Sequence, residues 1–158
     1  IRVHAYWNFL SGACGYTYGN NAIWQMFSPG NSFNIPPLTD WKTALDRPGA
    51  DDLCHLKNLL EKRPFHLLIP DQSVIYGPNP ENDNHIRAAV ASNQSFLLVY
   101  LAKGQPVDVD LRKLNNRCQA FWYNPRDGSS SEIGAFPPGG SGGDRCRTGT
   151  KCVVEAPR

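Results

Sequence analysis

The stretch "GYTYGNNAIW", residues 15–24, decides how the first part of the chain is interpreted. Its Tyr-Thr-Tyr core, residues 16–18, is typical of a short strand, and the Gly-Asn-Asn that follows at 19–21 ends that strand abruptly. Trp24 comes almost at once. The stretch is either an ordinary core strand followed by a turn, or the rim of a site that holds a sugar.

Helical patterns flank this predicted strand. Before it, apolar residues recur with helical spacing at Val3, Tyr6, Trp7 and Leu10. No capping residue precedes this helix, so the chain opens inside it. The expected order over residues 1–63 is helix, strand, helix.

The second helical region comes in two parts. Thr39 or Asp40 could cap a short helix, "WKTAL" at 41–45, and a longer helix begins near Pro48, where a first turn tolerates proline. Pro64 marks its end. The apolar face of this longer helix consists of Leu53, Leu56, Leu59 and Leu60.

Helix, strand, helix is the repeating unit of an α/β barrel or sheet, and one strand cannot close either. We therefore expect residues 1–70 to be an incomplete α/β segment. Such a segment needs a partner polypeptide docked on residues 1–63.

Beyond a proline-rich linker at 71–83, the pattern changes to short strands separated by turns. The expected strands are "HIRAAVAS", "SFLLVYLA", "PVDVDL", "RCQAFWYNP", "SEIGAF" and "KCVVEA". In "VDVDL" the alternation predicts one apolar and one solvated face. Residues 84–158 are thus predicted to form a small all-β antiparallel sandwich or barrel.

Charge and composition exclude two classes of partner. The net charge is +2, from 16 basic and 14 acidic residues spread along the chain, so no basic block indicates nucleic acid. No basic amphipathic helix indicates a membrane surface, and the apolar runs are too short to span one. No leader follows Ile1, so we expect any signal peptide to be already removed.

Five cysteines favour a secreted protein. Cys146 and Cys152 suit a small disulfide-closed loop, and Cys14 and Cys54 could form a second pair, which would leave Cys118 over. Connectivity does not follow from the sequence. A glycosylation sequon, "NQS", begins at Asn93 in a predicted turn and is also compatible with secretion.

The order of several motifs resembles the C-terminal part of the apiosidase-like glycoside hydrolases. The matching stretches are "GACGYTYGNNAIWQMFSPG", "ALDRPGADDLCHLKNLLEKRPF", "IPDQS", "LLVYLAKGQPVDVDLRKL" and "FWYNPRDGSSSEIGAF". This family has a (β/α)8 barrel followed by a β-sandwich named for collagen binding. The resemblance implies that residues 16–18 are the last barrel strand and that 40–63 hold the last barrel helix. The docking partner would then be the N-terminal barrel polypeptide. The name of this sandwich family does not establish a function, and residues 84–158 show no pattern that indicates a collagen-specific surface.

Glycoside hydrolysis usually requires two carboxylates that flank the bond. Asp108 and Asp110 have a suitable spacing along their strand, but we assign both to a solvated face. Asp51 and Asp52 fit the N-terminus of a helix, and Asp71 fits a structural role in a turn. The resemblance places the family's catalytic acids on earlier barrel strands, so we assign no catalytic residue to this chain.

The predicted substrate-binding residues lie at the end of the last strand, where barrel enzymes gather their sites. Asn20 and Trp24 would reach this face, together with Tyr16 and Tyr18 if these do not pack in the core. Aromatic rings and amides are typical sugar-binding groups. No metal-ligand spacing or phosphate-binding loop occurs, and we expect no cofactor.

The leading hypothesis is that the chain is the C-terminal portion of a secreted glycoside hydrolase acting on plant or microbial polysaccharide. One alternative is a binding module for carbohydrate or matrix, in which Trp122 and Tyr123 would be exposed side by side. The other alternative is a purely structural domain that braces the barrel.

Overall fold

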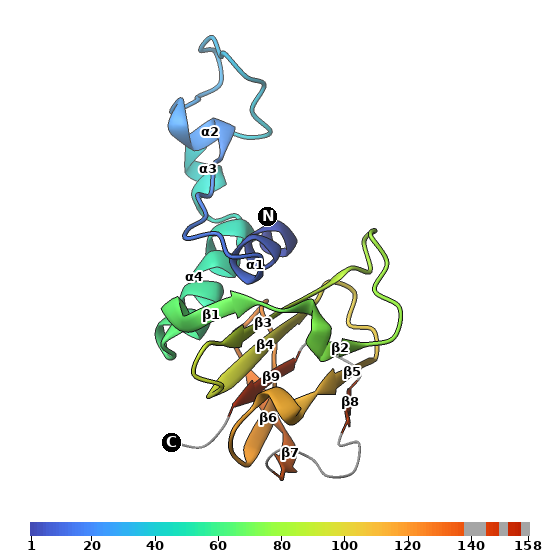
Figure 1. Ribbon diagram of the computed structural model, residues 1–158. Coiled ribbons are helices and arrows are strands. Elements are labelled where there is room, and N and C mark those ends of the chain that lie inside the picture. The colour runs from blue at the N-terminus through green and yellow to red at the C-terminus, as the bar shows by residue number, and fades with distance from the viewer. Residues whose placement is uncertain (138–144, 149–151, 156–158) are drawn as a thin grey trace.

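The computed structural model describes residues 1–137, 145–148 and 152–155, with side chains placed for residues 1–137. Short helices dominate the first part and strands the second (Figure 1). The α-helices are α1 Arg2–Leu10, α2 Asn21–Trp24, α3 Trp41–Leu45 and α4 Pro48–Glu61. The 3-10 turns are η1 Phe65–Leu67, η2 Gln72–Val74 and η3 Leu111–Lys113.

Two antiparallel sheets form the β part. The strands are β1 Leu68–Pro70, β2 Ile75–Tyr76, β3 Ile86–Ala91, β4 Phe96–Leu101, β5 Val107–Asp110, β6 Cys118–Tyr123, β7 Ser130–Phe136, β8 Arg145–Thr148 and β9 Cys152–Glu155. In the described residues, one sheet has the order β1-β3-β4-β9-β6-β7 and the other the order β2-β5-β8. All six strands predicted from the sequence are present.

Three strands were not predicted. The segment assigned to the end of the barrel includes β1, which pairs with β3, and the predicted linker includes β2, which pairs with β5. Both are very short, and β1 ends in a proline, so neither gives a clear alternating pattern. The third, β8, pairs with β5.

The first core lies between the two sheets. It contains Leu97, Val99 and Leu101 of β4, which meet Val107 and Val109 of β5 in one buried cluster. Cys118 of β6 belongs to the same cluster and is 1% exposed. The alternation of a strand sends every second residue of β4 into this core.

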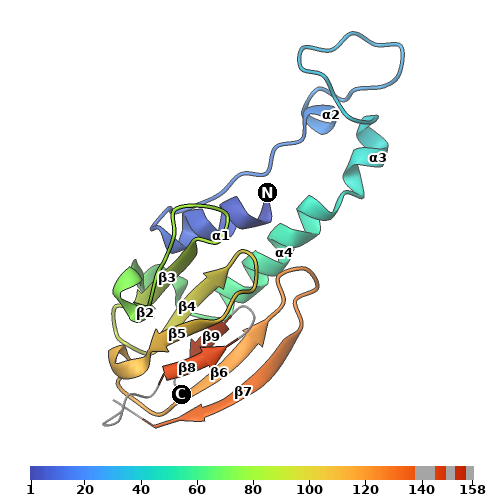
Figure 2. The same cartoon turned by 90° about the vertical axis from the view of Figure 1, so that its right-hand side faces the viewer.

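The second core covers the opposite face of the β3–β4 hairpin. There Phe96, Leu98 and Tyr100 pack against buried residues of α1 and α4. Figures 1 and 2 show these two helices lying against the hairpin. The buried residues from the helices are Ala5, Tyr6, Leu10, Leu56, Leu59 and Leu60. The amphipathic stripes predicted for both helices thus bury against a sheet that this chain provides.

Polar contacts fix the helices in place at their edges. The Arg2 guanidinium donates to the Asp52 carboxylate at 2.6 Å, and both side chains are largely shielded from solvent. The Tyr123 hydroxyl on β6 donates to the backbone carbonyl of His55 at 2.8 Å. Asp51 lies in the first turn of α4, as predicted, whereas Asp52 has this ion-pair partner as well.

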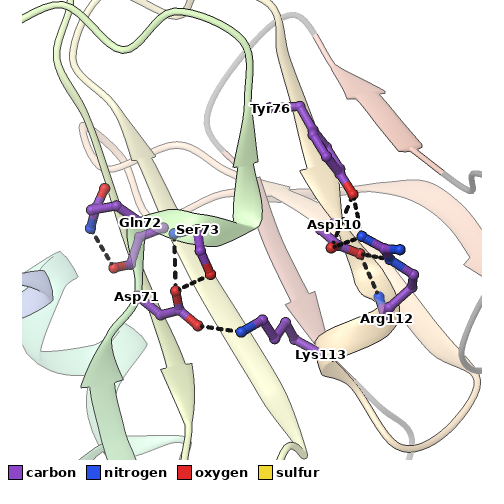
Figure 3. A network of polar contacts seen from close by, with 8 residues as sticks. Asp71, Gln72, Ser73, Tyr76, Asp110, Arg112 and Lys113 are labelled. Carbon is purple, nitrogen blue, oxygen red and sulfur yellow. Dashed lines mark hydrogen bonds and ion pairs between the residues drawn. The ribbon is translucent and has the colours of Figure 1, made fainter.

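The expectation that Asp110 lies on a solvated face of β5 is wrong, because its side chain is buried. Its residue is 7% exposed, and its carboxylate accepts hydrogen bonds from the Arg112 guanidinium at 2.7 and 2.9 Å and from the Tyr76 hydroxyl at 3.0 Å (Figure 3). The alternating pattern failed because β2 covers this edge of β5 and brings Tyr76 against it. The network ties β2 to the turn η3 that follows β5.

Asp71 has the structural role that its motif indicates. Its carboxylate accepts from the Ser73 amide at 3.0 Å and the Ser73 hydroxyl at 2.6 Å, which caps η2. Lys113 pairs with the same carboxylate at 3.2 Å (Figure 3). These contacts lower the pKa of Asp71, chiefly through the Ser73 hydroxyl.

The predicted disulfide between Cys14 and Cys54 is wrong, because both are exposed free thiols. Cys54 lies outside the buried face of α4, so its thiol has no element packed over it. The side chains of Cys146 and Cys152 lie outside the described residues, and their strands belong to different sheets. Asn93 lies in the exposed β3–β4 turn, where it accepts from the Ser95 hydroxyl at 2.7 Å.

None of the helices in the described ranges combines the length and the apolar character that a membrane-spanning segment needs.

A pair of core truncations should show that the helices and the sandwich unfold together. Leu97 faces the inter-sheet core and Leu98 the helical core, and both are buried. We expect Leu97→Ala and Leu98→Ala each to lower the free energy of unfolding by about 2–5 kcal/mol. Urea unfolding followed by circular dichroism and by tryptophan fluorescence should give one coincident transition for each variant. An early, separate loss of helix in Leu98→Ala would contradict a shared core.

The Asp110 network should make stability depend on pH. The Arg112 hydrogen bond, aided by Tyr76, lowers the pKa of Asp110 from 3.8 to about 2. A carboxyl whose pKa is lower in the folded state contributes stability above its unfolded pKa and loses it as the pH falls toward the folded pKa. Between pH ~5 and ~2 we expect the free energy of unfolding of the wild type to fall by up to about 2 kcal/mol more than that of Asp110→Asn. Urea midpoints of both proteins across this range test it, and parallel curves would refute it.

Candidate functional site

The segment that the sequence assigned to the last barrel strand is extended but is not a strand in this structure. Residues 15–20 have no ladder partner, and no other described residue hydrogen-bonds to the backbone of residues 15–19. A strand requires a neighbour for its N–H and C=O groups. The predicted strand Tyr16–Tyr18 is therefore absent here because no neighbouring strand borders it. Figure 2 shows the segment rising away from the two sheets toward α2.

Both tyrosines of this segment face α4. Tyr16 packs against the helical core and lines a shallow groove with Leu53 and Leu56. Tyr18 lies one turn nearer the start of α4, where a Cβ added to Gly49 would come within 3.1 Å of its ring. The two residues are two apart in the sequence, so an extended backbone turns both toward the same side. Thr17 and Gly19 are exposed on the other side.

Asn20 is the N-cap of the short helix α2. Its side-chain oxygen accepts a hydrogen bond from the Ala22 amide at 2.9 Å, a contact typical of Asn before a first helical turn. Its side-chain nitrogen donates to the Tyr18 hydroxyl at 3.4 Å. Asn20 follows the extended segment, as its sequence indicates, but α2 was not predicted because a helix of this length has no detectable periodicity.

Trp24 ends α2 and is 54% exposed. Its indole nitrogen donates to the Asn21 side chain at 3.3 Å. After Trp24 the chain forms a projecting loop that returns to α3, and Gln25 braces this loop by bonding to the backbone of Asn34 and Ile35. Figures 1 and 2 show α2, α3 and the loop standing clear of the sheets. The Asp40 side chain caps α3, as predicted.

An open cleft of about 370 Å3 lies where the extended segment, the returning loop and the start of α4 meet. Tyr18 and Asn20 line it, whereas Tyr16 and Trp24 do not. The other lining residues are Ile1, Gly19, Asn21, Pro36, Leu38, Thr39, Arg47, Pro48 and Gly49. The structure thus brings together only two of the four predicted substrate-binding residues.

Sequence reasoning missed the far wall of this cleft. Arg47 and Thr39 lie there, joined by a contact of 3.5 Å between the guanidinium and the hydroxyl. Thr39 precedes α3 and Arg47 follows it, immediately before α4, and neither position has a helical or strand pattern that indicates a cleft.

The cleft offers hydrogen-bonding and apolar groups but no acid. None of its lining residues is Asp or Glu, and Arg47 carries its only charged side chain. Within the described residues no three His, Cys, Asp or Glu side chains gather as they would around a metal ion. This surface can hold a polar ligand, and hydrolysis would need carboxylates from elsewhere.

The two parts of the chain match two family models. Residues 1–66 match the model described as "Apiosidase-like, catalytic domain", and residues 69–143 match "Putative collagen-binding domain of a collagenase". No curated protein matches significantly.

Two solved structures are similar over 98% of this chain. One, described as a glycoside hydrolase, is 33% identical with a TM-score of 0.84. The other, a glycoside hydrolase family 5 protein from Bacteroides vulgatus ATCC 8482, is 32% identical with a TM-score of 0.85. The chain spans about a third of their length, 36% and 35% respectively.

The chain is therefore related to glycoside hydrolases: residues 1–66 are similar to the apiosidase-like catalytic domain and residues 69–143 to the collagen-binding type of domain, as its sequence motifs indicate.

Proposed function

We propose that this chain acts as the C-terminal portion of a secreted glycoside hydrolase that cleaves plant or microbial polysaccharide. In this proposal residues 16–18, within the extended segment 15–19, are the last strand of a (β/α)8 barrel, α4 is the helix after it, and the sandwich is an accessory domain. The observation that carries the proposal is the extended, unpaired segment whose two tyrosines face α4.

A barrel strand has this geometry. Alternate side chains of such a strand face the surrounding helices, and the remaining ones face the barrel interior. Tyr16 and Tyr18 already face a helix, which leaves Thr17 and Gly19 for the interior. The backbone of residues 15–19 still offers its hydrogen-bonding groups, so the segment can accept a neighbour along each edge.

Exposed apolar residues also support docking of an N-terminal barrel polypeptide. Large apolar side chains rarely gather on the surface of a protein that acts alone. Within residues 1–63 the exposed ones are Ile1, Trp24, Met26, Phe33, Ile35, Leu38 and Leu45, with exposed fractions from 46% to 85%.

The cleft at Tyr18 and Asn20 would then form part of the substrate-binding face. It lies after the extended segment, at the end where barrel enzymes hold their substrates. Because it carries no carboxylate, the catalytic acids would come from the docked polypeptide. An extracellular location belongs to the same proposal, and the exposed turn at Asn93 fits it.

One set of contacts supports a bracing role for the sandwich. The outer face of β3–β4 is buried by α1 and α4, and Tyr123 bonds to α4 instead of standing free. Trp122 and Tyr123 are both half-buried. They pack against different cores and do not form a flat aromatic platform.

A complementation experiment tests the barrel proposal. The glycoside hydrolase that is 33% identical can be truncated to the part that this chain does not match. We expect the truncated protein and this chain to be inactive separately, and to form a one-to-one complex that hydrolyses polysaccharide. Thr17→Pro should prevent the complex, because proline removes an N–H donor that a central strand needs. Thr17→Val keeps the donor and is the matched control.

Both Thr17 variants should leave the melting temperature of the free chain unchanged, since Thr17 is exposed there. Hydrolysis by this chain alone, or equal complex formation by Thr17→Pro and Thr17→Val, would refute the proposal.

The role of Asn20 can be separated from its role as a helix cap. Asn20→Ser keeps an N-cap oxygen but removes the amide, whereas Asn20→Ala removes both. If the amide binds sugar, both variants should raise the KM of the complemented enzyme by about tenfold, the effect of one lost hydrogen bond to substrate. Only Asn20→Ala should also lower the melting temperature. Normal kinetics for Asn20→Ser would limit Asn20 to capping.

A further inference from the structure

A second cleft lies on the β part, apart from the one at Tyr18. It has a volume of about 350 Å3 and opens between the turn after β4 and the β6–β7 hairpin. None of its lining residues is shared with the first cleft. Those that carry the argument are Lys103, Trp122, Arg126 and Ser131.

The charged side chains that line this cleft are all positive. Lys103 and Arg126 line it, and no Asp or Glu does. The only carboxylate paired with Lys103 among the described residues is Asp83, at 3.5 Å, and the Asp83 side chain is 88% exposed. An exposed pair of this kind contributes little and exchanges readily for another anion. Within the described part of the chain, no acidic side chain pairs with the Arg126 guanidinium, which leaves it available to a ligand.

The hairpin that carries Arg126 is well ordered by its own contacts. The Arg126 amide donates to the Asn124 side chain at 3.1 Å, and Pro125 beside it is fully buried. Asp127, the nearest acid along the chain, accepts from the Ser129 amide and hydroxyl and from Asn124. These contacts hold its carboxylate within the turn, and Asp127 does not line the cleft. These contacts hold the backbone that carries Arg126, and its exposed guanidinium can bind a carboxylate through two parallel hydrogen bonds.

The floor of the cleft is aromatic with a hydroxyl beside it. Part of the Trp122 side chain packs on the inter-sheet core, and the rest lines the cleft. Ser131 is the direct cross-strand partner of Trp122, so its side chain lies on the same face of the sheet. A partly buried indole next to polar groups is the arrangement that binds a ring with one apolar face.

We propose that this cleft binds an acidic oligosaccharide, with a sugar ring against Trp122 and a uronic acid carboxylate held by Arg126 and Lys103. The cations and the aromatic floor favour an anionic ring compound. That the ring is a sugar rests on the proposed function as a glycoside hydrolase. The sandwich would then hold an acidic polysaccharide at a distance from the barrel site.

Binding to the complete 158-residue chain tests this, with no hydrolysis needed. Calorimetric titration with tri-galacturonate should show binding that weakens with added salt, and the neutral galactotriose of the same linkage should bind at least about tenfold more weakly. The variant Lys103→Gln/Arg126→Gln should lose a similar factor. Its control, Lys62→Gln/Arg117→Gln, removes the same charge from exposed residues outside the cleft and should bind as the wild type does.

A second variant, Ser131→Glu, places a like charge beside Trp122 on an exposed strand position and should abolish binding without unfolding the protein. Three results would overturn the proposal: equal binding of the acidic and neutral trimers, equal loss in both double variants, or full competition by inorganic phosphate. These outcomes are separate from the complementation experiment. If Lys103→Gln/Arg126→Gln binds normally while the complemented enzyme is active, only this inference fails.

Discussion

The β3–β4 hairpin is the element on which the rest of the structure depends, because both of its faces are buried. One face of β4 packs on β5 and the second sheet, and the other packs on α1 and α4. Large apolar side chains alternate between these two cores along a single strand, from Phe96 to Leu101. The hairpin is therefore a shared wall, and neither the sandwich nor the helical layer could keep its core without it.

The elements that pack on this shared wall could be predicted from the sequence, but their packing could not. The helices α1 and α4 were recognisable because each has one apolar stripe, and six of the described strands because turn residues separate them. A strand buried on both faces has no alternation that would tell which element covers which side. The packing of α1 and α4 on β3–β4 was therefore not predictable, nor was the burial of Asp110, which depends on a two-residue strand that gave no signal of its own.

The candidate site shows more clearly how far prediction from the sequence could go. The sequence placed Asn20 correctly at the end of an extended segment, but strand pairing at Tyr16–Tyr18 depends on neighbours that are distant or external. Tyr18 and Asn20 meet the cleft, while Tyr16 faces α4 and Trp24 stands outside. Thr39 and Arg47 flank the short helix α3, and only the folded chain brings them to the cleft. The roles of individual side chains could thus be predicted where a cap or turn determines them, but not where tertiary contacts determine them.

The helix α4 links the two parts physically. Its buried face rests on the shared wall through Leu56, Leu59 and Leu60, and its first turn holds Tyr18 against Gly49. Contacts from the β6–β7 hairpin reach α4 as well, through Tyr123 and through Gly128, where a Cβ would come within 2.8 Å of the His55 ring. Any shift of α4 on the sheet would carry the extended segment and its cleft with it. The sandwich therefore fixes the orientation of residues 15–19, and it can influence the cleft at Tyr18 without lining it.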